Sequence, residues 1–238
     1  MIRQRRGRVA MRPLLACAVL TTVAALLAAC GAPFVATEGR TCVVEPGDSV
    51  YAIAWRYDLD YRDLARWNHL ANYRIEVGQV LRISPDGLAA GMAGNPATRQ
   101  KTQAARDSPR ADEPAVRFDW PANGTVVGPV RQPTGGSGLR ILGRLGDPVR
   151  AAASGRVVYT GTALRSYGHL VIVKHSNSLL SAYGHNQAVL VTEGQLVSRG
   201  QSIAAMGLGP GQQPALYFEI RLNGKPVDPQ TYLPQRSP

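Results

Sequence analysis

The sequence has few of the residues that build metal centres and disulfides, with three cysteines and four histidines among 238 residues. Acidic residues are also scarce, 16 against 27 lysines and arginines, while 45% of the chain is hydrophobic. A chain of this length and composition supports one or two packed domains. It therefore excludes both a small disulfide-stapled protein and a wholly disordered tail.

Outside the N-terminus, the lysines and arginines are not clustered in the sequence. Residues 1–29 contain five arginines and no acid, so the rest of the chain carries 22 basic and 16 acidic residues and a net charge of +6. These remaining basic residues form no helix face or stripe and match no nucleic-acid motif, so we do not expect a nucleic-acid partner. The modest positive excess suits anionic surroundings such as cell-wall polymer or lipid head groups.

The N-terminus has the pattern of a secretory signal. Within residues 1–29 a basic stretch precedes one apolar run, 13–29, which ends in small residues. The alternative is an uncleaved membrane anchor, although an apolar run of about 17 residues is at the lower limit for spanning a bilayer.

Residues 27–30, Leu-Ala-Ala-Cys, resemble the lipobox of bacterial lipoproteins. The resemblance implies that Cys30 becomes the acylated N-terminus, that residues 30–40 form a lipid-anchored tether, and that Cys42 remains as the only thiol, without a disulfide. Gly31, in place of an aspartate, is similar to lipoproteins sorted to the outer membrane. We therefore expect the protein on the inner leaflet of the outer membrane, facing the periplasm. Several acyl chains would hold it there, since a single chain binds only marginally.

Residues 41–84 predict a small α+β module in the order strand, helix, helix, strand. A strand over 41–45 is stopped by a Pro-Gly pair. Asp48 then stands where an N-cap is expected, ahead of a helix with apolar residues at i, i+3, i+4 and i+7. Asp60 marks the start of the second helix, and a strand over 80–83 closes the module.

The sequence VVEPGDSV at 43–50, together with VGQVL at 77–81, resembles a LysM domain over nearly the whole segment. LysM domains bind N-acetylglucosamine-containing glycans, usually peptidoglycan, in a shallow groove between the first strand–helix turn and the last helix–strand loop. By position, the resemblance places these residues in the groove: Gly47, Asp48, Ser49, Tyr73, Arg74 and Ile75. Backbone groups there would read acetamido groups while Tyr73 or Ile75 covers a sugar face. The alternatives are that Asp48 only caps a helix, Gly47 only makes a turn and Ile75 only packs in the core.

Residues 85–114 are rich in Ala, Gly, Pro, Arg and Asp and have no helical period, which predicts a flexible linker. A flexible segment of about 30 residues spans roughly 30 Å, enough for the two folded parts to act independently. A weakly helical Ala-rich piece is the alternative.

From residue 118 onward, short β-rich runs are separated by glycine and proline and show no helical period. Residues 115–238 are therefore expected to form a mainly antiparallel all-β domain. Asn223-Gly224 predicts a tight hairpin. The predicted strand runs are 126–127, 139–142, 149–159, 169–175, 179–185, 188–191, 202–206 and 215–222.

The motifs GRVVY at 155–159, YGH at 183–185 and FEI at 218–220 resemble the lysostaphin-type, or LytM-like, zinc metallopeptidases. Active members take zinc ligands from a His-x-x-x-Asp segment and from the second histidine of a His-x-His segment. These segments align with 136–140 and 215–217. The resemblance thus implies that the three ligand positions hold Gly136, Arg140 and Tyr217, that Ala215 replaces one assisting histidine, and that His185 alone survives from the catalytic set.

The chemistry of zinc ligands, independently of the family resemblance, also predicts that this domain holds no catalytic zinc. A catalytic zinc needs three protein ligands, and the domain has only His169, His175 and His185. Two of these stand at the ends of one predicted strand, roughly 20 Å apart. Arg140 would add a permanent positive charge where a cation should bind. We therefore expect no catalytic residue, no metal and no cofactor. His185 either bonds a partner or is a structural histidine bonded to backbone.

A peptidase scaffold without metal ligands, behind a LysM module and a lipid anchor, resembles the NlpD and EnvC class of murein hydrolase activators. The resemblance implies a protein that binds a zinc-dependent N-acetylmuramoyl-L-alanine amidase and switches it on, so that septal peptidoglycan is split and daughter cells separate. The order of parts is that of the NlpD branch, whereas Ala-Leu-Tyr at 215–217 is closer to EnvC.

The former substrate groove would then dock the amidase. Tyrosine and arginine dominate protein interfaces, and arginine pairs bidentately with acidic groups. The residues we expect in this docking groove are Arg140, Tyr167, Leu170, Tyr217 and Arg221. Each has a plainer alternative, as a loop, core or solvated strand residue. Two other functions remain open: a wall-binding tether without activator role, and an active zinc endopeptidase.

Overall fold

The computed structural model describes residues 40–85, 116–132 and 136–235, all of which fall within one compact unit of the chain, Glu38–Pro238. The predicted signal, the lipid-anchored tether with Cys30, and the linker over 86–114 lie outside the described residues. Within the described ranges, no helix combines the length and apolar character needed to cross a membrane.

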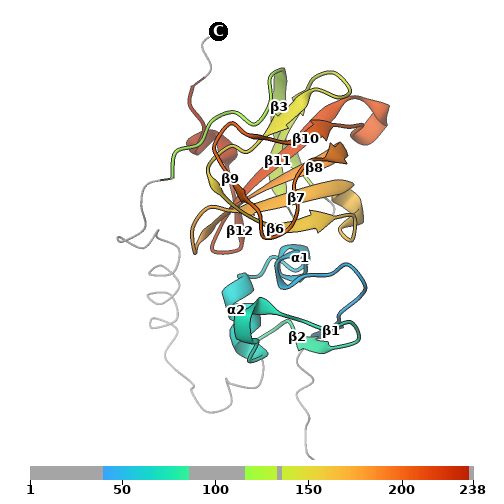
Figure 1. Cartoon of the computed structure of the whole chain (residues 1–238), viewed down its shortest axis with the longest axis vertical. Helices are drawn as coiled ribbons and strands as arrows, with labels where there is room; N and C mark the ends of the chain where they lie inside the picture. Colours follow the sequence, from blue (N-terminus) through green and yellow to red (C-terminus); the bar gives the residue numbers. More distant parts are fainter. Residues whose placement is uncertain (1–39, 86–115, 133–135, 236–238) are drawn as a thin grey trace, which may run out of the picture. The chain divides into compact units, whose positions relative to one another are not determined.

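The N-terminal module has the predicted order of strand, helix, helix, strand (Figure 1). The two strands pair antiparallel, with Cys42 opposite Leu81. The module buries one face of each helix, and Ile53 and Leu64 are fully inaccessible at its centre. Its elements are β1 (Thr41–Val43), α1 (Val50–Arg56), α2 (Tyr61–Trp67), the 3-10 turn η1 (Ala71–Tyr73) and β2 (Val80–Arg82).

The start of α1 corrects one prediction. Ser49, and not Asp48, is the N-cap, because the Ser49 hydroxyl accepts a hydrogen bond from the Ala52 amide at 3.1 Å. Asp48 lies one residue earlier, where its carboxylate pairs with Arg56 Nη2 at 2.6 Å. The predicted cap of α2 is confirmed, since the Asp60 side chain accepts from the next turn of backbone.

The C-terminal domain is the predicted antiparallel β structure, in one ten-stranded sheet (Figure 1). Its central path runs β3-β4-β11-β8-β7-β6-β9, and β10 joins β5 to β8 while β12 extends from β11. The strands are β3 (Thr125–Arg131), β4 (Ser137–Leu142), β5 (Pro148–Arg150), β6 (Gly155–Gly161), β7 (His169–Lys174), β8 (Leu179–Val189), β9 (Leu196–Val197), β10 (Ser202–Met206), β11 (Ala215–Leu222) and β12 (Lys225–Val227). Three 3-10 turns accompany them, η2 (Arg165–Tyr167), η3 (Pro210–Gln212) and η4 (Pro229–Thr231).

Most strand predictions hold, but β3 extends well beyond the predicted run 126–127, β9 and β12 were not predicted, and two further boundaries differ. The run 149–159 is broken into β5 and β6, and the run 179–185 and the first two residues of the run 188–191 belong to the single strand β8, which ends at Val189. The hairpin prediction is confirmed: Asn223 and Gly224 have φ of 51° and 77° between β11 and β12, the positive values that a two-residue turn requires.

Two apolar clusters form the core. One lies inside the β domain, around residues such as Ile141, Tyr183 and Phe218. The other runs from the helices of the LysM-like module onto one face of the sheet, so that Ile53 and Trp55 belong to the same cluster as residues of β6, β7 and β8. That the two folded parts act independently stays a prediction.

Candidate functional site

The positions that the resemblance aligns with zinc ligands lie close to one another. Arg140 on β4 is the direct antiparallel partner of Tyr217 on β11. Gly136 immediately precedes β4 and is buried. The ring centroid of His185 on β8 lies 6.3 Å from that of Tyr217. Ala215 is on the same strand, opposite Leu142. The residues that the sequence assigned to the former zinc site thus lie close together, and their role stays a prediction.

A buried carboxylate occupies the centre of this site. Glu219 on β11 is completely inaccessible to solvent. Its Oε2 accepts hydrogen bonds from the hydroxyl of Tyr217 at 2.7 Å and from the hydroxyl of Tyr167 at 3.4 Å. A Cβ added to Gly136 would lie 2.5 Å from the same Oε2, and it would also clash with the Tyr167 hydroxyl. The space that a ligand side chain at position 136 would need is therefore filled by Glu219 and Tyr167.

Arg221 balances the charge of this carboxylate. Its Nε lies 2.6 Å from Glu219 Oε1, and both side chains are buried, with Arg221 only 1% exposed. Burial raises the pKa of Glu219, an effect that the Arg221 guanidinium opposes. The pKa of the Tyr217 hydroxyl is also raised, by burial and by the neighbouring Glu219 charge, so this tyrosine stays protonated and donates. The site is a closed network of hydrogen bonds and ion pairs.

These residues do not fit a catalytic zinc. Gly136 has no donor atom, Arg140 carries a permanent positive charge, and the Tyr217 hydroxyl is committed to Glu219. In the described part of the chain, no group of three or more His, Cys, Asp and Glu side chains is arranged to hold a metal ion. Burial and the positive charge of Arg140 lower the pKa of His185.

His175 has a structural role. Its Nδ1 lies 2.9 Å from the Ser154 carbonyl oxygen and its Nε2 lies 2.7 Å from the Ser181 hydroxyl. Burial lowers the pKa of His175 to about 4, so the ring is neutral at physiological pH. His169, at the other end of β7, has an exposed side chain and uses its carbonyl oxygen to accept from Asn186.

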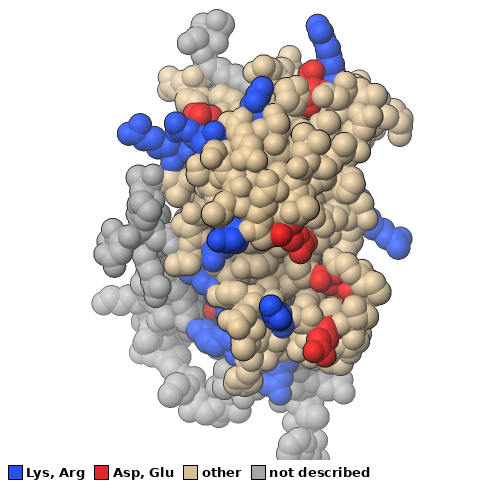
Figure 2. Space-filling model, in the orientation of Figure 1, with Lys and Arg blue, Asp and Glu red and all other residues tan. Residues whose placement is uncertain are grey.

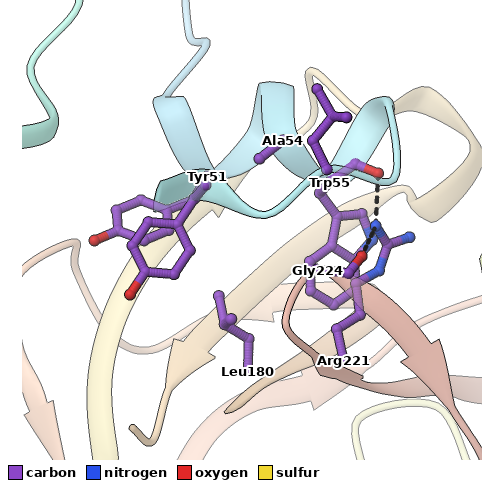
Figure 3. A pocket seen from close by; sticks show the side chains of 8 residues that line it. Tyr51, Ala54, Trp55, Leu180, Arg221 and Gly224 are labelled. Atoms are coloured by element: carbon purple, nitrogen blue, oxygen red, sulfur yellow. Dashed lines mark hydrogen bonds between the residues drawn. The ribbon is translucent and has the colours of Figure 1, made fainter. Parts of the chain in front are cut away.

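Four of the five predicted groove residues are covered. Tyr167 and Leu170 are fully buried and Tyr217 and Arg221 are each 1% exposed, whereas Arg140 is partly exposed. Trp55 of α1 contacts two of these residues: its ring stacks against the Arg221 side chain, as Figure 3 shows, and its ring centroid lies 6.5 Å from that of Tyr167. Partner binding through this groove stays a prediction, and in this conformation most of the groove is not exposed.

Three residues at this site were not identified from the sequence. Glu219 was recognised only as part of a scaffold motif, although Tyr217, Glu219 and Arg221 alternate along one strand and so point to the same face. That period of two was the available signal. Trp55 and Asp58 contact the groove from another part of the chain, and no local pattern indicates such a contact.

The residues predicted for the glycan groove have mixed surroundings. Gly47 and Arg74 are exposed, and Tyr73 is 39% exposed with its ring centroid 5.3 Å from that of Tyr61. The Asp48 side chain is inaccessible and held by Arg56, and the Ser49 hydroxyl caps α1. The side chains of Asp48 and Ser49 are therefore engaged in contacts within the module itself.

Ile75 is partly buried and packs against the second apolar cluster. No contact of the described residues tests glycan binding, which stays a prediction. On the face drawn in Figure 2, lysines and arginines are scattered and form no continuous basic stripe.

Two protein-family models match this chain. Residues 42–84 match the LysM domain model, and residues 134–229 match the model of peptidase family M23. The chain is therefore a LysM–M23 protein. Similarity to the solved structure of a putative peptidase M23 from Pseudomonas aeruginosa is 24% in sequence, with a TM-score of 0.45, covering 65% of this chain and 66% of that one.

The relatives define the family. The chain is 40% identical to "Lipoprotein NlpD/LppB homolog" of Pseudomonas aeruginosa over 230 residues, which covers 82% of this chain and 77% of that protein. It is 33% identical to "Murein hydrolase activator NlpD" of Escherichia coli, with 84% and 69% covered. It is 31% identical to "Outer membrane antigenic lipoprotein B" of Haemophilus influenzae, with 83% and 65% covered. The chain belongs to the NlpD/LppB lipoprotein family.

Proposed function

We propose that this protein is a non-catalytic lipoprotein that binds peptidoglycan and activates an N-acetylmuramoyl-L-alanine amidase for septal wall splitting. The LysM domain would hold the wall, and the M23 domain would dock the zinc-dependent amidase. Acylated Cys30 would anchor the chain in the inner leaflet of the outer membrane, facing the periplasm. The names of the relatives, murein hydrolase activators and outer membrane lipoproteins, support this proposal.

One observation carries the non-catalytic part. The space beside Gly136 is filled by the Glu219 carboxylate and the Tyr167 hydroxyl, and Glu219 is neutralised by Arg221 at 2.6 Å. A catalytic zinc site needs three protein ligands and an open coordination position. Here a buried network fills the place of one ligand, which favours a binding role for the domain over hydrolysis.

Activation by binding needs only a difference in affinity. If the amidase has a closed and an open form, an activator that binds the open form more tightly shifts the population toward it. A preference of about 1.4 kcal/mol is a tenfold shift. Arg140 is the predicted groove residue that remains partly exposed here, and it suits a first contact with an acidic amidase segment.

The test is release of dye from labelled peptidoglycan by the full chain alone, by an amidase alone and by both together. The proposal predicts release above the amidase level only in the mixture. Release by this chain alone would establish an endopeptidase. No stimulation, with retained sedimentation on peptidoglycan, would establish a tether.

Arg140→Glu should reduce the stimulation at least tenfold and leave sedimentation with peptidoglycan unchanged. Arg144→Glu is the matched control, because Arg144 is exposed in the turn after β4 and undergoes the same charge change outside the predicted groove. Equal stimulation by both variants would contradict docking at Arg140.

A further inference from the structure

The LysM module has an exposed apolar pair on the outer face of its two-stranded sheet, where β1 and β2 lie side by side (Figure 1). Val43 and Val80 are direct antiparallel partners, so their side chains point to the same face. They are 57% and 61% exposed, whereas Leu81, on the inner face, is fully inaccessible and packs in the cluster of the helices. Two adjacent valines with more than half of their surface in water form a candidate contact surface.

The two ends of this face carry charges of opposite sign. Arg82 is two residues after the exposed valine of β2, so it lies on the same face, opposite Thr41. Arg40 immediately precedes β1, and both arginines are exposed. At the other end, Glu45 and Glu76 are exposed in the connections that leave β1 and lead into β2. An aliphatic patch with arginines beside it is typical of surfaces that lie against anionic lipid.

The basic end is also the end that leads to the predicted lipid anchor. Arg40 is ten residues after Cys30, and a chain of ten residues extends to about 35 Å at most. The strand that enters the sheet here is paired with the one that leaves it, because the Ile83 amide donates to the Arg40 carbonyl at 2.8 Å. An acylated Cys30 would therefore hold this end of the module close to the leaflet, where tethering raises the effective concentration of lipid.

We propose that the outer face of β1 and β2 is a membrane-contact face, which lies against an anionic phospholipid leaflet. The two valines reach the boundary between head groups and acyl chains, and the two arginines pair with lipid phosphates. In one respect, the acylation of Cys30, this inference rests on the proposed function. It goes beyond that function because it gives the LysM module a second contact, apart from its predicted glycan groove.

This contact determines which way the glycan groove points. The predicted groove residues around Gly47 and Tyr73 lie in the connection that follows β1 and in the one that precedes β2. The Val44 amide donates to the Gln79 carbonyl at 2.9 Å, so these two connections meet at the end of the sheet opposite Arg40. With the basic end at the leaflet, the groove faces away from the membrane. The module then holds peptidoglycan at a distance from the outer membrane that the tether limits.

The first test places an environment-sensitive dye, nitrobenzoxadiazole, on the proposed face. The dye is attached through Val80→Cys in the acylated full chain, with Cys42→Ala to remove the other thiol, in vesicles of phosphatidylethanolamine with phosphatidylglycerol. Leu190→Cys is the matched control, because Leu190 is 60% exposed but belongs to the β domain. We expect emission from the Val80 position to be at least twofold higher than from the Leu190 position. Equal emission from the two positions would overturn the contact.

The second test concerns the charge. Arg82→Glu should lower the emission of the dye at position 80 by at least half, and replacing phosphatidylglycerol with phosphatidylcholine should have the same effect. Arg66→Glu is the matched control, because Arg66 is exposed on α2 of the same module and undergoes the same charge change. Emission that falls equally in the two variants would show that Arg82 has no particular role at the lipid surface.

The outcomes separate this inference from the proposed function. Acylation is read from the mass of the N-terminal peptide, and an unacylated Cys30 would contradict both the anchor and the contact. An acylated chain with equal emission at the two dye positions contradicts the contact alone. Emission at position 80 that rises with protein concentration without vesicles would show that a second copy covers the face, which also contradicts lipid contact. If the contact is found but no amidase is stimulated, the proposed function fails while the contact stands.

Discussion

The buried pair of Arg221 and Glu219 gives the most demanding prediction about this fold. In Arg221→Met, the Glu219 carboxylate loses its 2.6 Å partner while remaining inaccessible to solvent. Breaking a buried ion pair from one side lowers stability by about 3–5 kcal/mol. That is a large part of the total stability of about 5–15 kcal/mol typical of native proteins. The double variant Arg221→Met/Glu219→Gln removes both charges and keeps an acceptor for Tyr217, so we expect it to recover at least half of the loss.

The pH dependence separates this cause from a simple packing defect. Burial raises the pKa of Glu219, and without Arg221 only the hydrogen bond from the Tyr217 hydroxyl opposes that shift. A carboxyl whose folded pKa exceeds its unfolded value stabilises the fold below the unfolded pKa, and this contribution is lost as pH rises through the folded pKa. Arg221→Met should therefore lose more stability at pH 8 than at pH 5. Urea unfolding followed by circular dichroism at both pH values measures this. An equal loss at both values, or a double variant no more stable than the single one, would refute the reasoning.

Three further predictions concern His175, Ser49 and Gly136. Between pH 6.5 and 4 the free energy of unfolding should fall by about 3 kcal/mol through His175. The buried neutral ring has a pKa of about 4, so it stabilises the folded state above pH 6.5, and this stabilisation is lost as the pH falls toward 4. In His175→Gln, unfolding titrations should show a smaller dependence of stability on pH over this range. Ser49→Ala should lower stability by about 1 kcal/mol through loss of the α1 cap, measured by thermal unfolding, and a change below about 0.3 kcal/mol would show that the cap is dispensable. Gly136→Ala should lower stability by about 1–3 kcal/mol, because its methyl group would clash with the Tyr167 hydroxyl and Glu219; an unchanged urea midpoint would mean that this space is not filled.

Local patterns predicted most of the fold. The strands β10 and β11 have the predicted bounds, and the Asn223-Gly224 hairpin follows from the positive φ that these two residues tolerate. The error at α1 is also local in origin. Asp48 and Ser49 are both good caps. In the structure the Asp48 carboxylate is engaged by Arg56 and by the Glu45 amide, while the Ser49 hydroxyl accepts from the Ala52 amide and caps the helix.

The candidate site was predicted in part. Family motifs located Gly136, Arg140 and Tyr217, which the structure brings together. The contact of Trp55 and Asp58 with Arg221 was missed because it joins residues more than 160 positions apart in sequence. An exposed strand arginine and a buried one look alike in a linear pattern, and only the tertiary contact distinguishes them.

The structure narrows which of the residues predicted for the glycan groove are accessible to a glycan. The side chains of Asp48 and Ser49 are already bonded within the LysM domain, whereas Gly47 and Arg74 are exposed. Glycan recognition by this module would therefore depend on exposed backbone around Gly47 and on the partly exposed Tyr73 ring.

The central claim is that a peptidase metal pocket has been rebuilt as a surface that binds another protein. Calorimetric titration of the purified full chain with zinc, with peptidoglycan release followed in the same sample, tests this most directly. The account predicts no stoichiometric binding and no release without an amidase. One equivalent of zinc bound tightly, with release that a chelator stops, would contradict it.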